Sequence, residues 1–112
     1  MRLDDNTVTS PYFKSPAYRY IRLADKLPRR SEESDPIAHV KLFDPTGSWT
    51  WYICEYDPET RLAWGLVKGF EAEVGYFNMD ELAEARPALG LPLERDLHWA
   101  PRRLSELREG AL

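Results

Sequence analysis

The sequence has few of the residues that hold metal ions or cross-link a chain. It contains one cysteine, Cys54, and two histidines, His39 and His98, among 112 residues. One cysteine excludes a disulfide within the chain and a cysteine-based metal site, and it fits a reducing compartment. The two histidines lack the spacing of metal ligands. We therefore expect no metal site and no cofactor.

Long apolar runs, internal repeats and a strong excess of one charge are also missing. No stretch approaches the ~20 apolar residues that a membrane helix needs, and the N-terminus has two acidic residues, Asp4 and Asp5, without an apolar run behind them. Such a start is unlike a signal peptide, so we expect a cytoplasmic protein that does not bind membranes. The net charge of −4 counts against a protein that coats nucleic acid by bulk charge, but it leaves a local basic patch open.

The length and the hydrophobic fraction predict one domain with its own core. A chain of 112 residues, 43% of them hydrophobic, can bury about two-thirds of its unfolded surface. Residues 1–36 differ from the rest: after a polar start, Ser15 and Pro16 predict the opening of a helix that continues at helical spacing to Leu27. We expect this N-terminal segment to pack on a sheet or on a partner, and residues 37–112 to form a single α+β domain.

From residue 37 the apolar period changes to two, which is typical of strands. Asn78 is expected to cap one helix and Pro101 to open another, while residues 91–99 are extended and add at most one short strand. The fold class predicted is α+β, an antiparallel β-meander of four to five strands with two to three short helices packed on it. The strands predicted before Asn78 are residues 38–43, 49–56, 62–67 and 71–77.

Both faces of this sheet are expected to be apolar. If Phe43 pairs with Trp49 across the first turn, alternation assigns each side chain to a face. A half-solvated antiparallel sheet alternates apolar with polar residues, so something must cover each face. Helices after Asn78 are expected over one face, and the N-terminal segment, a second copy of the chain or a partner over the other. One face then carries His39, Lys41, Phe43, Trp49, Trp51 and Ile53, and the other carries Val40, Leu42, Tyr52, Cys54 and Tyr56.

An ordered series of motifs resembles a known family. The series comprises VKLFD (40–44), GSWTWY (47–52), GLV (65–67), EVGYF (73–77), DEL (80–82) and LGLPLERDL (89–97). Together these motifs resemble the bacterial family called domain of unknown function 2958 over residues 37–107, whereas the stretch before Asp35 departs from the family pattern. The resemblance implies a small protein of plasmids and other mobile genetic elements. It favours an accessory role there, near conjugation and DNA-processing genes, that includes interference with host defences.

Aromatic and charged side chains supply the candidates for a binding site. Trp49, Trp51 and Trp64 either stack bases, as in single-strand binders, or fill the core, and Lys41, expected beside Trp51, suits either interpretation. Arg95, between two carboxylates, either pins a loop to the sheet or binds a partner. The basic clusters either meet phosphates or form a solvated surface with their acidic neighbours; they are Lys26, Arg29 and Arg30, and Arg102 and Arg103.

Two pairs of residues have the chemistry of catalysis. Cys54 and His39 are a nucleophile and a base, but the assumed register puts them on opposite faces. Asp96 and His98 point the same way from an extended stretch, without a nucleophile or a metal set beside them. We therefore predict no catalytic residue.

The leading hypothesis is a non-enzymatic interaction module of a mobile element that binds a protein, such as a host-defence or DNA-processing component, or a second copy of itself. The first alternative is a single-stranded nucleic-acid binder that uses the sheet aromatics. The second is a small hydrolase-like enzyme that uses Asp96 and His98. The binding residues predicted from the sequence are Trp49, Trp51, Lys41, Trp64, Glu94, Arg95, Asp96, His98 and Trp99.

Overall fold

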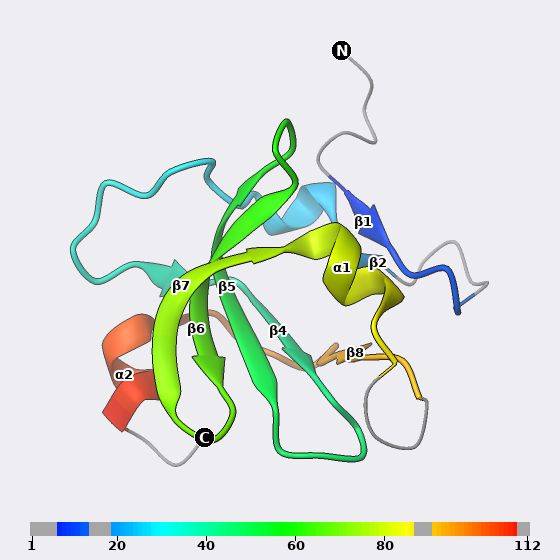
Figure 1. Ribbon diagram of the computed structural model, residues 1–112. Coiled ribbons are helices and arrows are strands. Elements are labelled where there is room, and N and C mark those ends of the chain that lie inside the picture. Colours follow the sequence, from blue (N-terminus) through cyan, green and yellow to red (C-terminus); the bar gives the residue numbers. More distant parts are fainter. Residues whose placement is uncertain (1–6, 14–18, 87–90, 110–112) are drawn as a thin grey trace.

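The chain folds into a mostly antiparallel sheet with two short α-helices, as Figure 1 shows for the computed structural model. The structure describes residues 7–13, 19–86 and 91–109. The strands are β1 (Val8–Thr9), β2 (Arg19–Ile21), β3 (Ile37–Ala38), β4 (Val40–Phe43), β5 (Thr50–Asp57), β6 (Leu62–Lys68), β7 (Ala72–Asn78), β8 (Glu94–Arg95) and β9 (Arg102–Arg103). The helices are the 3-10 helix η2 (Leu23–Asp25), α1 (Met79–Glu84) and α2 (Leu104–Glu109).

The central sheet has five strands in the order β7-β6-β5-β4-β8, all paired antiparallel. Two small sheets, β1-β2 and β3-β9, accompany it. The α+β class with an antiparallel sheet, predicted from the sequence, is confirmed. In the part of the chain that the structure describes, no helix has the length and apolar character needed to cross a membrane.

The hairpin between β4 and β5 has a register one residue away from the expected one. Phe43 lies opposite Thr50 instead of Trp49. The turn is the cause: the Asp44 amide donates to the Trp49 carbonyl (3.0 Å), and Asp44 Oδ1 accepts from the amide and the hydroxyl of Thr46 (2.9 Å each). The carboxylate thus organises a turn that closes at Asp44 rather than at Phe43.

This slip exchanges the faces of one strand relative to its neighbour. Lys41 lies opposite Tyr52, on the face away from Trp51. The expected placement of Lys41 beside Trp51 is therefore wrong. The face that holds Trp51, called here the first face, carries Val40, Leu42, Trp51 and Ile53.

A β-bulge between Ile53 and Glu55 interrupts the pairing of β5 with β6. Beyond it Tyr56 lies opposite Ala63, whereas pairing with Leu62 was expected. A bulge adds one residue to one strand and so reverses the alternation. Tyr56 consequently packs in the same core as Ile53.

Each face of the sheet is covered by a different part of the chain. In Figure 1, α1 and β1 lie side by side at one end of the sheet, and α2 lies at the other end. The N-terminal segment was one of three expected covers, and it is the one observed. The first core combines sheet residues with Val8, Tyr20, Ile21, Met79, Ala83 and Leu93, and the second contains Ala38, Tyr52, Cys54, Leu66, Leu104 and Leu107.

The N-terminal segment contributes strands to the first core. The prediction of a helix up to Leu27 is wrong for the residues that the structure describes. β2 pairs with β1, and only the three residues of η2 are helical. Tyr20 is fully buried and its hydroxyl donates to the Leu93 carbonyl (2.6 Å), so tertiary contacts override the helical spacing. The expected helix start, Ser15 and Pro16, lies outside the described residues.

Helix α1 begins where the sequence predicts. Asn78 Oδ1 accepts from the amides of Asp80 (2.8 Å) and Glu81 (3.1 Å), which satisfies two donors of the first turn. Helix α2 begins at Leu104, later than the expected opening at Pro101.

Candidate functional site

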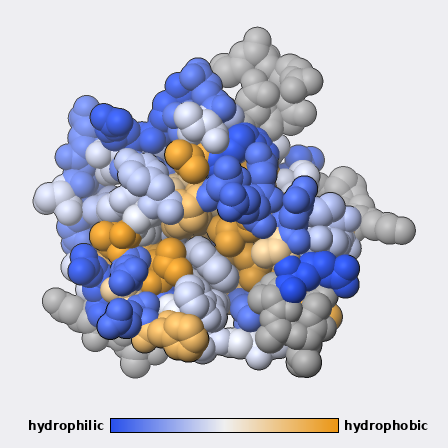
Figure 2. All heavy atoms as spheres, viewed as in Figure 1, coloured by the Kyte–Doolittle hydropathy of each residue, from blue (hydrophilic) through white to orange (hydrophobic). Residues whose placement is uncertain are grey.

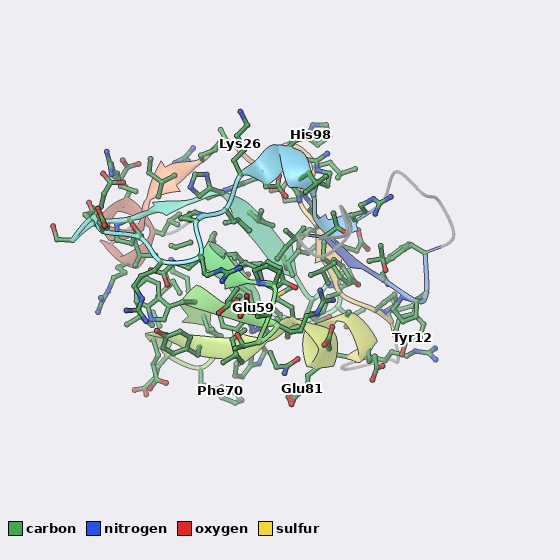
Figure 3. The ribbon with its side chains drawn as sticks, turned by 90° about the horizontal axis from the view of Figure 1, so that it is seen from above. Tyr12, Lys26, Glu59, Phe70, Glu81 and His98 are labelled. Carbon is green, nitrogen blue, oxygen red and sulfur yellow. The ribbon has the colours of Figure 1, made fainter. Side chains whose placement is uncertain are left out.

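Three aromatic side chains gather at the tips of the two central hairpins. Trp49, directly before β5, stacks on Trp51 with ring centroids 6.1 Å apart and meets Phe70 edge-on at 5.7 Å. Phe70 stands in the β6–β7 turn, is 95% exposed, and lies at the periphery of the molecule in Figure 3. Gly69 allows this contact, because a Cβ there would lie 2.5 Å from the Trp49 ring. We call Trp49, Trp51 and Phe70 the tip cluster.

A shallow pocket of about 210 Å³ opens beside the tip cluster on the first face. Val67, Glu71 and Glu73 line it together with Trp49 and Phe70. Neither glutamate carboxylate forms an ion pair within the described chain. The tip cluster therefore combines exposed aromatic surface with uncompensated negative charge.

The apolar surface is not confined to the tip cluster. In the view of Figure 2, hydrophobic surface gathers over the sheet and is surrounded by hydrophilic residues. Tyr76 and Val74, on the edge strand β7, are 67% and 40% exposed. These two side chains lie opposite Trp64 and Leu66, so β7 adds exposed apolar surface apart from the tip cluster.

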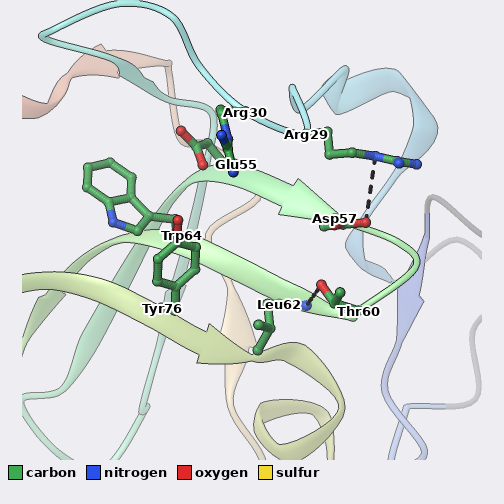
Figure 4. A pocket seen from close by; sticks show the side chains of 8 residues that line it. All are labelled: Arg29, Arg30, Glu55, Asp57, Thr60, Leu62, Trp64 and Tyr76. Atoms are coloured by element: carbon green, nitrogen blue, oxygen red, sulfur yellow. Dashed lines mark hydrogen bonds and ion pairs between the residues drawn. The ribbon is translucent and has the colours of Figure 1, made fainter.

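A second pocket, of about 360 Å³, lies on the other face of the sheet (Figure 4). Trp64, Tyr76 and Leu62 form its apolar floor. Arg29 closes one side through Asp57 (Nε to Oδ1 3.6 Å), with Arg30, Glu55 and Thr60 along the rest of the rim. Trp64, predicted as a binding residue, is partly buried against the second core and also lines this pocket.

A third group, the basic-aromatic cluster, also lies on the second face. Lys41 Nζ and Arg102 Cζ lie 5.6 and 5.7 Å from the ring centroid of Trp99, and Lys68 Nζ lies 5.9 Å from that of Tyr52. The two rings are 5.3 Å apart. Three cations thus converge on two neighbouring rings. Lys41 and Trp99, both predicted binding residues, meet here rather than at Trp51.

Arg95 links strand β8 to the N-terminal segment. Its guanidinium donates to both carboxylate oxygens of Asp25 (2.6 Å each) and to the Tyr20 carbonyl (3.0 Å). Burial alone would raise the pKa of Asp25, but the hydrogen bonds from Arg95 and from the Arg22 amide outweigh it, so the net pKa is lowered. We call the Asp25–Arg95 pair the arginine bolt. It holds β8 to the N-terminal segment.

The neighbours of Arg95 are arranged separately. Glu94 is half-buried in β8, opposite Phe43. Asp96 Oδ1 accepts from the His98 amide (2.9 Å), and Asp96 Oδ2 lies 3.7 Å from Lys41 Nζ. His98 is exposed and stands at the periphery in Figure 3. The Asp96 carboxylate is thus engaged by the backbone and by Lys41.

Cys54 lies inside the second core. Burial raises the pKa of its thiol to about 12, which keeps it in the unreactive thiol form at neutral pH. Burial also lowers the pKa of His39, and no hydrogen bond joins the His39 ring to Cys54 in the described part of the chain. The expected register, which placed the two residues on opposite faces, is not the observed one. The burial of Cys54 nevertheless counts against its acting as a nucleophile with His39 as the base.

The structure divides the predicted binding residues among these places. Trp49 and Trp51 belong to the tip cluster, Trp64 to the second pocket, Lys41 and Trp99 to the basic-aromatic cluster, and Arg95 to the arginine bolt. Sequence reasoning missed Phe70 and its acidic neighbours. A phenylalanine inside a tight turn, where polar residues are usual, was the signal that pointed to it.

The family is established by comparison with family models. Residues 17–111 match the family described as "Protein of unknown function (DUF2958)". The chain therefore belongs to this family, as the motif series suggested. The match begins at residue 17, and so it includes part of the stretch before Asp35 that was expected to depart from the family pattern. No curated protein and no solved structure matches the chain.

Proposed function

We propose that this protein is a non-enzymatic interaction module that binds another protein through the tip cluster. The observation that carries the proposal is Phe70, which is almost fully exposed yet rests edge-on against Trp49. Burying a phenylalanine side chain contributes about 1.5–3 kcal/mol of favourable free energy. An exposed Phe70 lacks this contribution, and a partner surface that covers it would supply it. Tryptophan and other aromatic anchors dominate the binding energy of protein interfaces.

The charge around the tip cluster favours a protein over a nucleic acid as the partner. Glu71 and Glu73 border the pocket beside Trp49, and their carboxylates would repel the phosphates of a nucleic acid. A protein surface with lysine or arginine complements them. An accessory role on a mobile genetic element, with a host-defence or DNA-processing component as the partner, belongs to the same proposal and rests on the family resemblance.

The test is capture of a partner from a host lysate by the tagged protein, with bound proteins identified by mass spectrometry. Phe70→Ser is the diagnostic variant, because an exposed side chain can be removed without disturbing a core. Leu97→Ser is the matched control, since Leu97 is also exposed but lies outside the tip cluster. We expect a protein retained by the wild type and by Leu97→Ser and lost with Phe70→Ser. Equal recovery with all three proteins would contradict the proposal.

Binding of single-stranded nucleic acid is a second candidate function, favoured by the basic-aromatic cluster. Lys41, Lys68 and Arg102 bring positive charge to Tyr52 and Trp99 on the second face, as in binders that pair a basic groove with aromatic rings. Titration with single-stranded DNA at low salt, followed by tryptophan fluorescence, tests it. Quenching that weakens in Lys68→Gln supports this candidate, and unchanged fluorescence removes it. The hydrolase-like alternative gains no support from the arrangement of Asp96 and His98.

A further inference from the structure

Strand β7 is an open edge of the central sheet. It stands last in the strand order, and no described strand pairs with its outer side. It has seven residues, whereas the opposite edge, β8, has two. Natural proteins usually shorten or block an exposed edge because its free backbone groups pair readily with another strand. A long edge without proline or lysine is therefore a candidate for strand addition.

The pairing with β6 shows which backbone groups face outward. The Met79 amide donates to the Arg61 carbonyl (2.9 Å) at one end of the ladder, and the Gly69 amide donates to the Glu71 carbonyl (3.0 Å) at the other. Hydrogen-bonded pairs alternate along an antiparallel ladder, so the odd-numbered residues of β7 bond to β6. The amides and carbonyls of Ala72, Val74 and Tyr76 consequently point away from the sheet.

Side chains beside this edge differ between the two faces. Tyr76 lies opposite Trp64 and Val74 opposite Leu66, on the second face, where Tyr76 lines the larger pocket. Glu73 lies opposite Val67 on the first face, where the tip-cluster pocket opens. An added strand would place alternate side chains next to each face. One set would meet exposed apolar surface and the other would meet carboxylates.

Gly75 adds room at the centre of the edge. A Cβ built there meets no atom within 4 Å, so no described residue packs against this position. Glycine within a strand often marks a place where another backbone approaches closely. The space beside Gly75 would therefore admit the backbone of an added strand.

We infer that the β7 edge accepts an extended segment of a partner protein as an added strand, and that this segment alternates apolar residues with lysine or arginine. The inference rests on the proposed protein-binding function and names its mode. Glu71 and Glu73 form no ion pair in the described chain, and a basic segment would supply one. A second copy of β7 would bring another Glu73, with Glu71 just before the strand, and no lysine or arginine, so charge favours a different chain as the occupant.

Two capped peptides test this inference, TKVKVKVT and its acidic counterpart TEVEVEVT. Each is titrated into the labelled protein while the backbone amide NMR signals are followed. We expect TKVKVKVT to shift the amides of residues 72–78, and TEVEVEVT to leave them unchanged. Absence of binding by TKVKVKVT at millimolar concentration, or shifts confined to another surface, would overturn the inference.

Two variants separate backbone pairing from charge. Val74→Pro removes an outward amide without touching the ladder to β6, and we expect it to weaken TKVKVKVT binding about tenfold. If that variant does not fold, Ala72→Pro removes another outward amide, at the first position of the strand. Glu71→Lys/Glu73→Lys should exchange the preference in favour of TEVEVEVT. Unchanged affinity in a folded proline variant would overturn strand addition, while loss of partner capture by Phe70→Ser would still uphold the tip cluster as the binding site.

Discussion

Removing the carboxylate of the arginine bolt should strongly destabilise the fold. In the wild type, both carboxylate oxygens of Asp25 lie 2.6 Å from the Arg95 guanidinium, and the Arg95 side chain is only 5% exposed. Asp25→Ala would leave this buried guanidinium without its ionic partner. Breaking a buried pair by removing one member costs about 3–5 kcal/mol, because a charge is left without compensation. A domain of this size has a total unfolding free energy of about 5–15 kcal/mol, so the loss would be a large share of it.

Urea unfolding at pH 7, followed by tryptophan fluorescence, measures this cost. The control is Asp25→Leu/Arg95→Met, which removes both charges and keeps apolar volume; it should recover most of the lost free energy, since an apolar replacement of a buried pair is often neutral. A loss below about 1 kcal/mol for Asp25→Ala would place the pair among ordinary surface ion pairs and refute the reasoning. A double variant as unstable as the sum of the two single variants would refute it as well.

Three further predictions concern single groups. The pKa of Asp25 is lower in the folded state, so its ionised carboxylate stabilises the fold above the unfolded-state pKa of about 3.9. This stabilisation is lost as the pH falls through the folded-state pKa. The unfolding free energy of the wild type should therefore decrease below about pH 4, and that of Asp25→Leu/Arg95→Met should decrease less. Gly65→Ala should unfold or severely destabilise the protein, because its Cβ would lie 1.8 Å from the Tyr52 carbonyl oxygen, whereas Gly75→Ala, with open space, should change the thermal midpoint little; equal effects would contradict this. The Cys54 thiol, whose pKa burial raises to about 12, should react with a disulfide reagent at pH 8 only after unfolding; rapid reaction of the native protein would show that it is accessible.

The local signals in the sequence predicted most of the sheet, because strands and caps depend on neighbouring residues. Alternation found the four strands from β4 to β7, and Asn78 marked the start of α1. Register was harder, because the β4–β5 turn closes through the Asp44 carboxylate, and several turns are compatible with the same residues. The bulge after Ile53 depends on pairing with β6, which no local pattern reveals.

The N-terminal segment and the candidate site depended on contacts between distant residues. Tyr20 has helical spacing with Leu23 and Leu27, but its conformation depends on the hydrogen bond of its hydroxyl to the Leu93 carbonyl. Arg95 was recognised as a candidate for a buried arginine, yet its carboxylate partner comes from Asp25, 70 residues earlier. Phe70 was overlooked because its contact with Trp49 joins two hairpin tips. Such pairings follow only from the assembled fold.

The most direct test of the central claim is the affinity of the captured partner for the wild type and for Phe70→Ser, measured by calorimetry. An aromatic anchor at an interface contributes about 2 kcal/mol or more, so the account predicts a Kd at least about thirtyfold weaker for the variant, with Leu97→Ser unchanged. A Kd for Phe70→Ser within about twofold of the wild-type value would contradict the claim that this protein binds its partner through the tip cluster.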